Sequence, residues 1–219
     1  MGNIIIGYLL SFLCVFGIIG MITLLHKLIG FSNEISRKLI HVLVGFTWLP
    51  IYFYLRGTVH MIILPVIFVA VNWLSVHFNI FKSMERETDG KKKDLGTVYY
   101  AVCMTLMSVF TYIFPEKLPC YGIAVFCLSF GDGAAAIAGK LVKKYNKELM
   151  RGKTLAGTLA CLFAAVIGVY FICAVIKQPI SLLNAVIFGV VTAMFELFSG
   201  KYDNFTVSLG VMLTACLIL

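Results

Sequence analysis

Long apolar runs occupy most of the chain, and short polar segments separate them. A helical span of a bilayer needs roughly 17–25 mainly apolar residues, and this pattern predicts eight such spans. They cover residues 3–25, 39–55, 58–80, 96–114, 119–141, 155–176, 179–198 and 204–219. The second and the last are short, so seven spans is the alternative. The pattern therefore predicts an all-α, polytopic membrane bundle of seven or eight transmembrane helices, forming a single domain over 1–219.

The composition supports a membrane protein. Hydrophobic residues make up 61% of the 219 residues and charged residues 13%, against roughly 45–50% and 25% in soluble domains. A soluble fold of this size lacks the interior volume to bury that much apolar surface. The seven cysteines form no C-x-x-C pair and nearly all lie in apolar runs. These features exclude a soluble enzyme, a disordered tail, a secreted disulfide scaffold and a zinc site built on paired cysteines.

Lysine and arginine are distributed unevenly among the connections between spans. The first, third, fifth and seventh connections, near 26–38, 81–95, 142–154 and 199–203, hold 15 of the 18 basic residues when Lys140, just before the fifth, is counted with it, and each even connection holds one. The positive-inside rule places the basic loops in the cytoplasm, and both termini are therefore predicted outside. The net charge of +8 is explained by this topology and by attraction to anionic lipid, so we expect no nucleic-acid partner.

Two acidic residues lie within apolar spans, where a charge costs at least roughly 2.5–3.5 kcal/mol at mid-depth. Asp132 has Gly131 and Gly133 on either side, and such glycines let the backbone break or a neighbouring helix approach closely. Glu196 lies near the cytoplasmic end of its predicted span. We expect Asp132 to serve a cation or phosphate site. The alternatives are an interhelical polar contact for Asp132 and snorkelling to the interface for Glu196.

A Gly-Lys-Thr sequence, Gly152-Lys153-Thr154, opens the predicted span at 155 and follows Lys140 and a basic loop. Free backbone N–H groups at a helix start attract phosphate, lysine supplies a charge, and threonine offers a hydroxyl. The sequence is not a P-loop, because Lys147 stands where that motif has glycine. The motif predicts phosphate binding. Its alternative is an ordinary helix start beside a lipid-facing basic loop.

The other cytoplasmic connections also contribute polar groups to this face. These are Arg37, Lys38 and His41 at the second span, Lys93, Asp94 and Thr97 at the fourth, and Glu196, Asp203 and Asn204 around the seventh connection. Basic groups suit phosphates, and carboxylates suit Mg²⁺. Together with a glycine-broken helix at Asp132, they predict a phosphoryl-transfer site. Positive-inside anchoring is the alternative for Arg37 and Lys38.

Five short motifs follow one another between residues 37 and 207. They are Arg37-Lys38-x-x-His41, Asp94-x-Gly96-Thr97-Val98-Tyr99-Tyr100, Gly131-Asp132-Gly133-Ala134-Ala135-x-x-x-Gly139-Lys140, Gly152-Lys153-Thr154-x-x-Gly157-Thr158, and Glu196 followed by Asp203-Asn204-x-Thr206-Val207. This set resembles the CTP-dependent polyprenol-type lipid kinases: dolichol kinase, phytol kinase and the CTP-dependent diacylglycerol kinase. It resembles phosphatidate cytidylyltransferase more distantly.

The resemblance implies a cytoplasm-facing catalytic domain that uses Mg²⁺ to transfer the γ-phosphoryl of CTP to a lipid alcohol. The alcohol would be a polyprenol or dolichol, a phytol-like isoprenoid or diacylglycerol. The implied catalytic and metal-binding residues are Asp132, Glu196 and Asp203. The implied phosphate-binding residues are Gly131, Gly133, Lys140, Gly152, Lys153, Thr154, Gly157 and Lys93. Arg37, Lys38, His41, Asp94, Thr97 and Asn204 would line the substrate pocket.

Two departures from the family pattern distinguish the alternatives. Thr154-Leu155-Ala156-Gly157 stands where the family often has a larger residue run with Trp or Ser. The Pro-Gly-His-Gly-Gly ending of the cytidylyltransferases is absent from the sequence, which favours a kinase over a CDP-lipid synthase. A transporter or flippase is the second alternative, but the predicted outer half carries almost no charge. The residues identify neither the lipid nor the oligomeric state, and CTP is implied by the resemblance alone.

Overall fold

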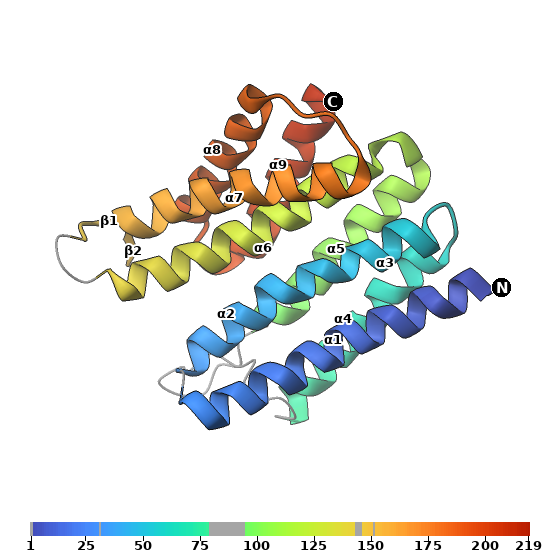
Figure 1. The fold of residues 1–219 in the computed structure, drawn as a ribbon, viewed down its shortest axis with the longest axis horizontal. Coiled ribbons are helices and arrows are strands. Elements are labelled where there is room, and N and C mark those ends of the chain that lie inside the picture. The colour runs from blue at the N-terminus through green and yellow to red at the C-terminus, as the bar shows by residue number, and fades with distance from the viewer. Residues whose placement is uncertain (1, 31, 79–94, 143–145, 151) are drawn as a thin grey trace. The chain divides into compact units, whose positions relative to one another are not determined.

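The structure is a computed structural model that describes residues 2–30, 32–78, 95–142, 146–150 and 152–219. Its contacts divide the chain into two compact units, Met1–Pro115 and Glu116–Leu219, which are described in turn. Figure 1 traces the elements of both units along the chain.

The first unit is built from apolar helices: α1 (Gly2–Ile29), α2 (Asn33–Val44), α3 (Trp48–Pro50), α4 (His60–Phe78) and α5 (Gly96–Ile113). The Ser32 hydroxyl caps α2 by accepting from the Ile35 amide. A 3₁₀ turn, η1 (Gly45–Thr47), and a π-helical turn, η2 (Ile51–Leu55), extend α2 and α3 into one span that ends at Leu55. Pro50 lies in this irregular stretch, and proline removes the N–H that a regular helix would use.

The core of the first unit forms where α1 meets α2. Val15, Ile19 and Ile22 recur at helical spacing on one side of α1 and pack with Ile40 of α2. The side chain of Phe68, from α4, packs against the same cluster. The helices α4 and α5 also pack together.

The second unit is centred on α6 (Leu118–Leu141), which follows a 3₁₀ turn, η4 (Pro115–Lys117). A short hairpin, β1 (Glu148–Met150) and β2 (Lys153–Thr154), leads to α7 (Leu155–Ile176), and α8 (Leu182–Ser199), a 3₁₀ turn, η5 (Gly200–Tyr202), and α9 (Asp203–Ile218) follow. Helix α6 packs against α7, α8 and α9, and Figure 1 shows α7 lying alongside it. Most of α6 is therefore buried, including Asp132.

Helix α6 runs without a break through Gly131 and Gly133, so the prediction of a glycine-broken helix is wrong. Gly131 instead allows close packing: a Cβ there would lie 2.8 Å from Thr192 Cγ2 and 3.1 Å from Cys161 Sγ. A Cβ on Gly157 of α7 would lie 2.9 Å from the Ala135 carbonyl oxygen of α6. These two glycines bring α6 close to its neighbours, which is the alternative that the sequence left open for Gly131.

The prediction of an all-α polytopic membrane protein is confirmed. Seven helical segments in the described residues are long and apolar enough to cross a membrane, and α9 is a shorter apolar helix. The chain is a multi-pass membrane protein. The hairpin β1–β2, paired antiparallel between Glu148 and Thr154, was not predicted. A single domain over 1–219 and the sidedness of the termini stay predictions.

Candidate functional site

The β1–β2 hairpin positions the candidate phosphate-binding residues at the start of α7. Gly152 adopts a positive φ of 78° in the turn, a conformation that glycine adopts without strain. Its amide donates to Glu148 Oε1 at 2.7 Å. Lys153 follows as the first residue of β2, and Thr154 is the N-cap of α7. The hairpin thus fixes the direction in which Lys153 leaves the backbone.

The ammonium of Lys153 forms an ion pair with Glu196 Oε1, 43 residues further along the chain on α8. The Glu196 side chain is only 2% exposed, whereas that of Lys153 is 26% exposed. A buried carboxylate needs such a partner, because burying an unpaired charge is expensive. Lys153 therefore neutralises Glu196 and keeps part of its own side chain open to solvent.

Lys153 lies outside the membrane-spanning helices, and its pKa is raised above 10.5. Burial lowers this pKa, but the negative charge of Glu196 and its hydrogen bond, followed by the charges of Asp132 and Asp203, outweigh burial. Lys153 is consequently a cation at neutral pH. The same effect shows that Asp132 on α6 and Asp203 at the start of α9 lie within electrostatic range of its ammonium.

These acids come from three helices of the second unit. Asp132 is 2% exposed, and Asp203 is half-buried, with its Oδ1 accepting from the Asn204 amide at 2.9 Å. Asn204 itself is buried. Lys153 thus pairs with Glu196 and lies within electrostatic range of Asp132 and Asp203.

The predicted metal ligands do not form a ready-made cage. No group of three or more His, Cys, Asp or Glu side chains among the described residues is placed to hold a metal ion. Glu196 is instead engaged by Lys153. Magnesium in phosphoryl-transfer sites is commonly held by one or two carboxylates together with substrate phosphates. Asp132, Glu196 and Asp203 stay predicted metal ligands, and Glu196 is paired with Lys153 in this structure.

The first turn of α7 does not offer the free N–H groups that the sequence suggested. The Leu155 amide donates to Lys147 O at 2.9 Å, and the Ala156 amide donates to Asn146 Oδ1 at 3.0 Å. The Gly157 amide donates to Thr154 Oγ1 at 3.2 Å. The expectation of an amide cradle is therefore corrected: Thr154 caps the helix and Gly157 packs against α6. Phosphate binding here would fall to side chains.

Two further residues of this region have roles that the sequence did not indicate: Asn146, and Thr158 at the end of the Gly-Lys-Thr motif. Asn146 donates through Nδ2 to Val142 O at 2.8 Å and to Gly139 O at 3.3 Å, while its Oδ1 accepts from α7. It thereby ties the end of α6 to the start of α7. Because it precedes Ala156 by ten positions, no local capping pattern in the sequence indicated this role. Thr158 Oγ1 is buried with no hydrogen-bond partner among the described residues, so it could bond a ligand.

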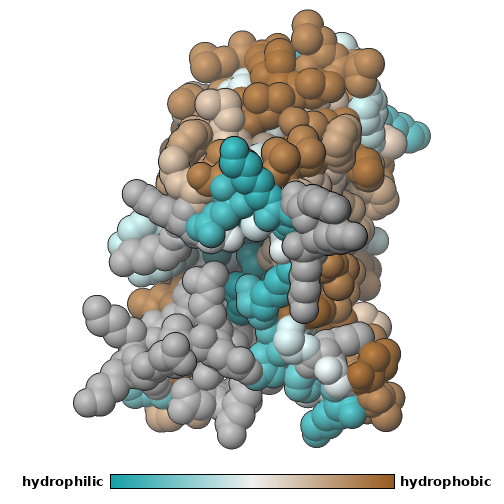
Figure 2. All heavy atoms as spheres, turned by 90° about the vertical axis from the view of Figure 1, so that its left-hand side faces the viewer, coloured by the Kyte–Doolittle hydropathy of each residue, from teal (hydrophilic) through white to brown (hydrophobic). Residues whose placement is uncertain are grey.

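Lys140 lies at the end of α6 and is exposed, and a Cβ on Gly139 would lie 3.2 Å from Thr154 Oγ1. Because Gly139 lies close to the Thr154 cap, Lys140 is at the end of α6 that faces the start of α7. Figure 2 views the molecule from the side that carries β1 and β2, where hydrophilic residues gather among hydrophobic ones. Lys140 is thus a second basic residue at this end of the second unit.

The candidates of the first unit lie on α2 and α5. Lys38 is buried on α2, and the His41 ring lies 4.8 Å from the Tyr100 ring of α5. Arg37 Nε and Nη2 are buried with no hydrogen-bond partner among the described residues, a condition that suits an anionic ligand. The Thr97 carbonyl accepts from Asn72 Nδ2 at 3.1 Å. Lys93 and Asp94 lie outside the described residues.

Comparison with known proteins finds relatives of one functional kind. The chain is 28% identical over 150 residues to the CTP-dependent diacylglycerol kinase 1 of Eremothecium gossypii, covering 62% of this chain and 45% of that protein. It is 28% identical over 145 residues to the enzyme of the same name from Saccharomyces cerevisiae, covering 62% and 49%. It is also 28% identical over 144 residues to the probable chloroplastic phytol kinase 2 of Oryza sativa subsp. japonica, covering 61% and 46%.

The chain thus spans about half the length of the curated relatives it matches. No family model matches it, and no solved structure matches it. The names of the relatives confirm the predicted resemblance to CTP-dependent lipid kinases.

Proposed function

We propose that this relative of the CTP-dependent lipid kinases transfers the γ-phosphoryl of CTP to the hydroxyl of a membrane lipid alcohol. The observation that carries the proposal is the Lys153–Glu196 ion pair with Asp132 and Asp203 in electrostatic range. These charges lie on or next to apolar helices. At such a position a water-soluble nucleotide and a lipid hydroxyl can meet. The names of the relatives support a lipid kinase and leave the acceptor lipid open.

In this proposal Lys153 binds nucleotide phosphate, and Glu196 is a positioning residue that holds the ammonium in place. Lys153 is charged at neutral pH and partly exposed, so it can contact phosphate without first losing a proton. Lys140 would add a second basic side chain, and the buried Thr158 hydroxyl a hydrogen bond. Arg37, Lys38, His41 and Thr97 stay predicted pocket residues of the first unit.

The transfer step follows from the chemistry of phosphoryl transfer. The lipid hydroxyl oxygen would form a bond to the γ-phosphorus while the bond from that phosphorus to the β,γ-bridging oxygen breaks, releasing CDP. Asp203 would accept the hydroxyl proton, since its carboxylate is half-buried and oriented by the Asn204 amide. Asp132, together with the CTP phosphates, would hold a magnesium ion that, when bound, neutralises phosphate charge.

Product analysis with CTP labelled at the α or the γ position tests the proposed function. Purified protein would be incubated with Mg²⁺ and a total membrane lipid extract. We expect γ-label in a lipid and release of CDP. Pyrophosphate and a CMP-bearing lipid would instead establish a cytidylyltransferase. Lipid or solute flux in liposomes without nucleotide would establish a transporter, and both outcomes would overturn the kinase proposal.

Asp132→Asn tests the site itself. The variant keeps the size of the buried side chain but removes its charge, so we expect loss of phosphoryl transfer with an unchanged thermal transition. Glu116→Gln is the matched control, because Glu116 is an exposed carboxylate in the turn before α6 and its variant should keep full activity. An active Asp132→Asn variant would remove Asp132 from the mechanism.

A further inference from the structure

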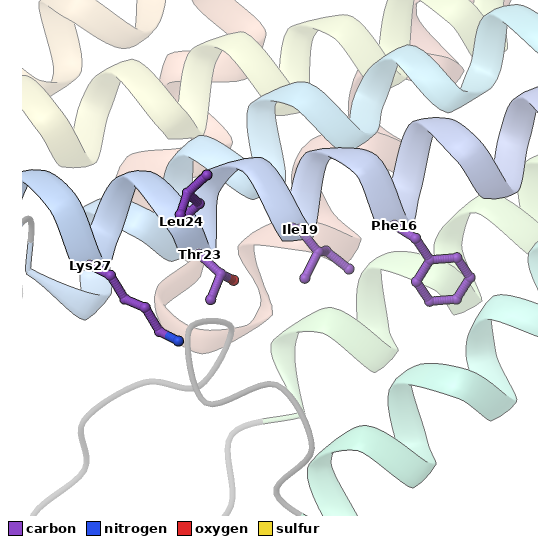
Figure 3. A pocket seen from close by; sticks show the side chains of 6 residues that line it. Phe16, Ile19, Thr23, Leu24 and Lys27 are labelled. Atoms are coloured by element: carbon purple, nitrogen blue, oxygen red, sulfur yellow. The ribbon is translucent and has the colours of Figure 1, made fainter.

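A groove runs along one face of α1, a helix that carries none of the residues of the candidate site. Its volume is about 350 Å³, within the range of roughly 300–1,000 Å³ typical of small-molecule sites. It is lined by Phe16, Ile19, Gly20, Thr23, Leu24 and Lys27. Figure 3 shows the five residues other than Gly20 following one another along the helix, with the Lys27 amine at one end.

The lining residues recur every three or four positions, so they share one helix face. Gly20 is exposed, and a Cβ at this position would meet no atom within 4 Å, so the groove is open beside it. Ile19 is buried in the core that α1 forms with α2. The Phe16 ring stacks on Phe12 with centroids 6.1 Å apart, and Phe12 packs against Phe68 at 5.5 Å. The inner wall is therefore held in place by the protein.

The chemistry of the groove changes along its length from apolar to cationic. Helix α1 has 28 residues, about 42 Å at 1.5 Å per residue, so its ends extend beyond a hydrocarbon core of about 30 Å. Lys27 lies about 10 Å further along the axis than Gly20. It follows His26 in the last turn, and α1 contains no acidic residue. An occupant must therefore be apolar beside Gly20 and anionic beside Lys27.

We propose that this groove binds one anionic phospholipid of the surrounding bilayer. One acyl chain would lie beside Gly20 between Phe16 and Leu24, and the phosphodiester would lie at the level of Thr23 and Lys27. An extended lysine side chain reaches the headgroup region readily, and anionic lipid attracts basic residues at this depth. This proposal does not depend on the proposed kinase activity.

The variant pair Gly20→Leu and Gly17→Leu tests the apolar part. Both glycines are exposed on α1 with no atom within 4 Å of the Cβ position, but only Gly20 lines the groove. Native mass spectrometry would count phosphatidylglycerol bound to each detergent-purified protein. We expect wild type and Gly17→Leu to bind one lipid alike, and Gly20→Leu to bind it about tenfold more weakly. Equal binding by the two leucine variants would overturn the proposal.

Lys27→Gln tests the headgroup separately, without altering the groove. Phosphatidylglycerol and phosphatidylcholine would compete for each protein in the same measurement. We expect wild type to prefer phosphatidylglycerol, and Lys27→Gln to lose that preference. Lys177→Gln, which removes an exposed lysine outside the groove, should keep it. A preference unchanged by Lys27→Gln would overturn the proposed contact and indicate only non-specific lipid around the helices.

Discussion

The two members of the Lys153–Glu196 ion pair have unequal surroundings. Glu196 is almost fully buried on α8, whereas Lys153 keeps about a quarter of its side chain exposed. If Glu196 loses its charge, Lys153 can turn to water or to Asp132 and Asp203. If Lys153 loses its charge, Glu196 is left as a buried anion without this partner. The two single substitutions should therefore differ in their effect on stability.

We expect Lys153→Met to destabilise the protein by about 3–5 kcal/mol, the usual cost of leaving a buried charge uncompensated. Glu196→Gln should cost less, and the double variant should be more stable than Lys153→Met alone. Denaturation of the purified protein would measure all three, with Lys177→Met as the exposed-lysine control. Equal losses from the two single variants would show that the pair does not couple in this way.

The pH dependence of this pair has a definite sign. Although burial opposes it, the carboxylates raise the pKa of Lys153 above 10.5 in the folded protein. A lysine with a raised pKa contributes stability that is fully present below its unfolded pKa and lost as the pH rises through its folded pKa. We expect the stability difference between wild type and Lys153→Met to stay constant from about pH 7 to 9 and to shrink above about pH 10.5. A decline below pH 9 would contradict this.

At the scale of elements, the close contact between α6 and α7 requires a glycine, Gly157, on α7. A Cβ on Gly157 would lie 2.9 Å from the Ala135 carbonyl oxygen, and a backbone atom cannot move aside without shifting the helix. We expect Gly157→Ala to destabilise the protein by about 1–3 kcal/mol. Gly20→Ala is the control: it meets open space on α1 and should stabilise the helix by up to about 1 kcal/mol. Thermal unfolding of both variants would measure this, and an unchanged melting temperature for Gly157→Ala would contradict the prediction.

Asn146 connects the end of α6 to the start of α7 through three hydrogen bonds. We expect Asn146→Ala to lower the free energy of unfolding by roughly 1–3 kcal/mol, because it leaves these backbone groups unpaired. It should also weaken CTP binding, since the hairpin that carries Lys153 lies between Asn146 and α7. Equilibrium binding and denaturation would measure both effects.

Asn146→Asp separates the two halves of this connection. The aspartate keeps an acceptor for the Ala156 amide but cannot donate to the carbonyls of Gly139 and Val142. We expect the cap of α7 to survive and the attachment to α6 to be lost, giving a smaller fall in stability than Asn146→Ala. If both variants bind CTP like wild type, the connection has no role in positioning Lys153.

At the scale of the whole molecule, the distribution of basic residues predicts which loops face the cytoplasm. Single cysteines at Leu149, in the β1–β2 hairpin, and at Lys177, between α7 and α8, would be introduced into a variant without the seven native cysteines. We expect an impermeant maleimide to label the cysteine at 177 in intact cells and the one at 149 only after permeabilisation. The reverse pattern would place the candidate site on the outer side.

The membrane architecture was predictable because its signal is local. An apolar run of spanning length must form a helix in lipid, since the bilayer offers no other partner for backbone N–H and C=O groups. Asp132, Glu196 and Lys153 were also identifiable from the sequence. Placing a charge in or next to an apolar span costs free energy, so such residues are candidates for a functional site.

The pairing within the site could not be predicted in the same way. Lys153 and Glu196 are separated by 43 positions, and the packing of α7 against α6 and α8 brings them together. The same packing assigns Gly157 to a helix contact, and Asn146 and Lys147 occupy the amides that the sequence suggested for phosphate. These outcomes depend on which groups meet in space.

The sequence by itself thus determined the spans, their number to within one, and the residues that carry charge into the apolar region. Hydropathy acts on each segment separately, which is why no tertiary information was needed. The tertiary structure alone decided that Lys153 pairs with Glu196, and that Gly131 and Gly157 serve helix packing. An ion pair or a close backbone contact joins residues from two different helices, whereas the hydropathy pattern describes each segment by itself.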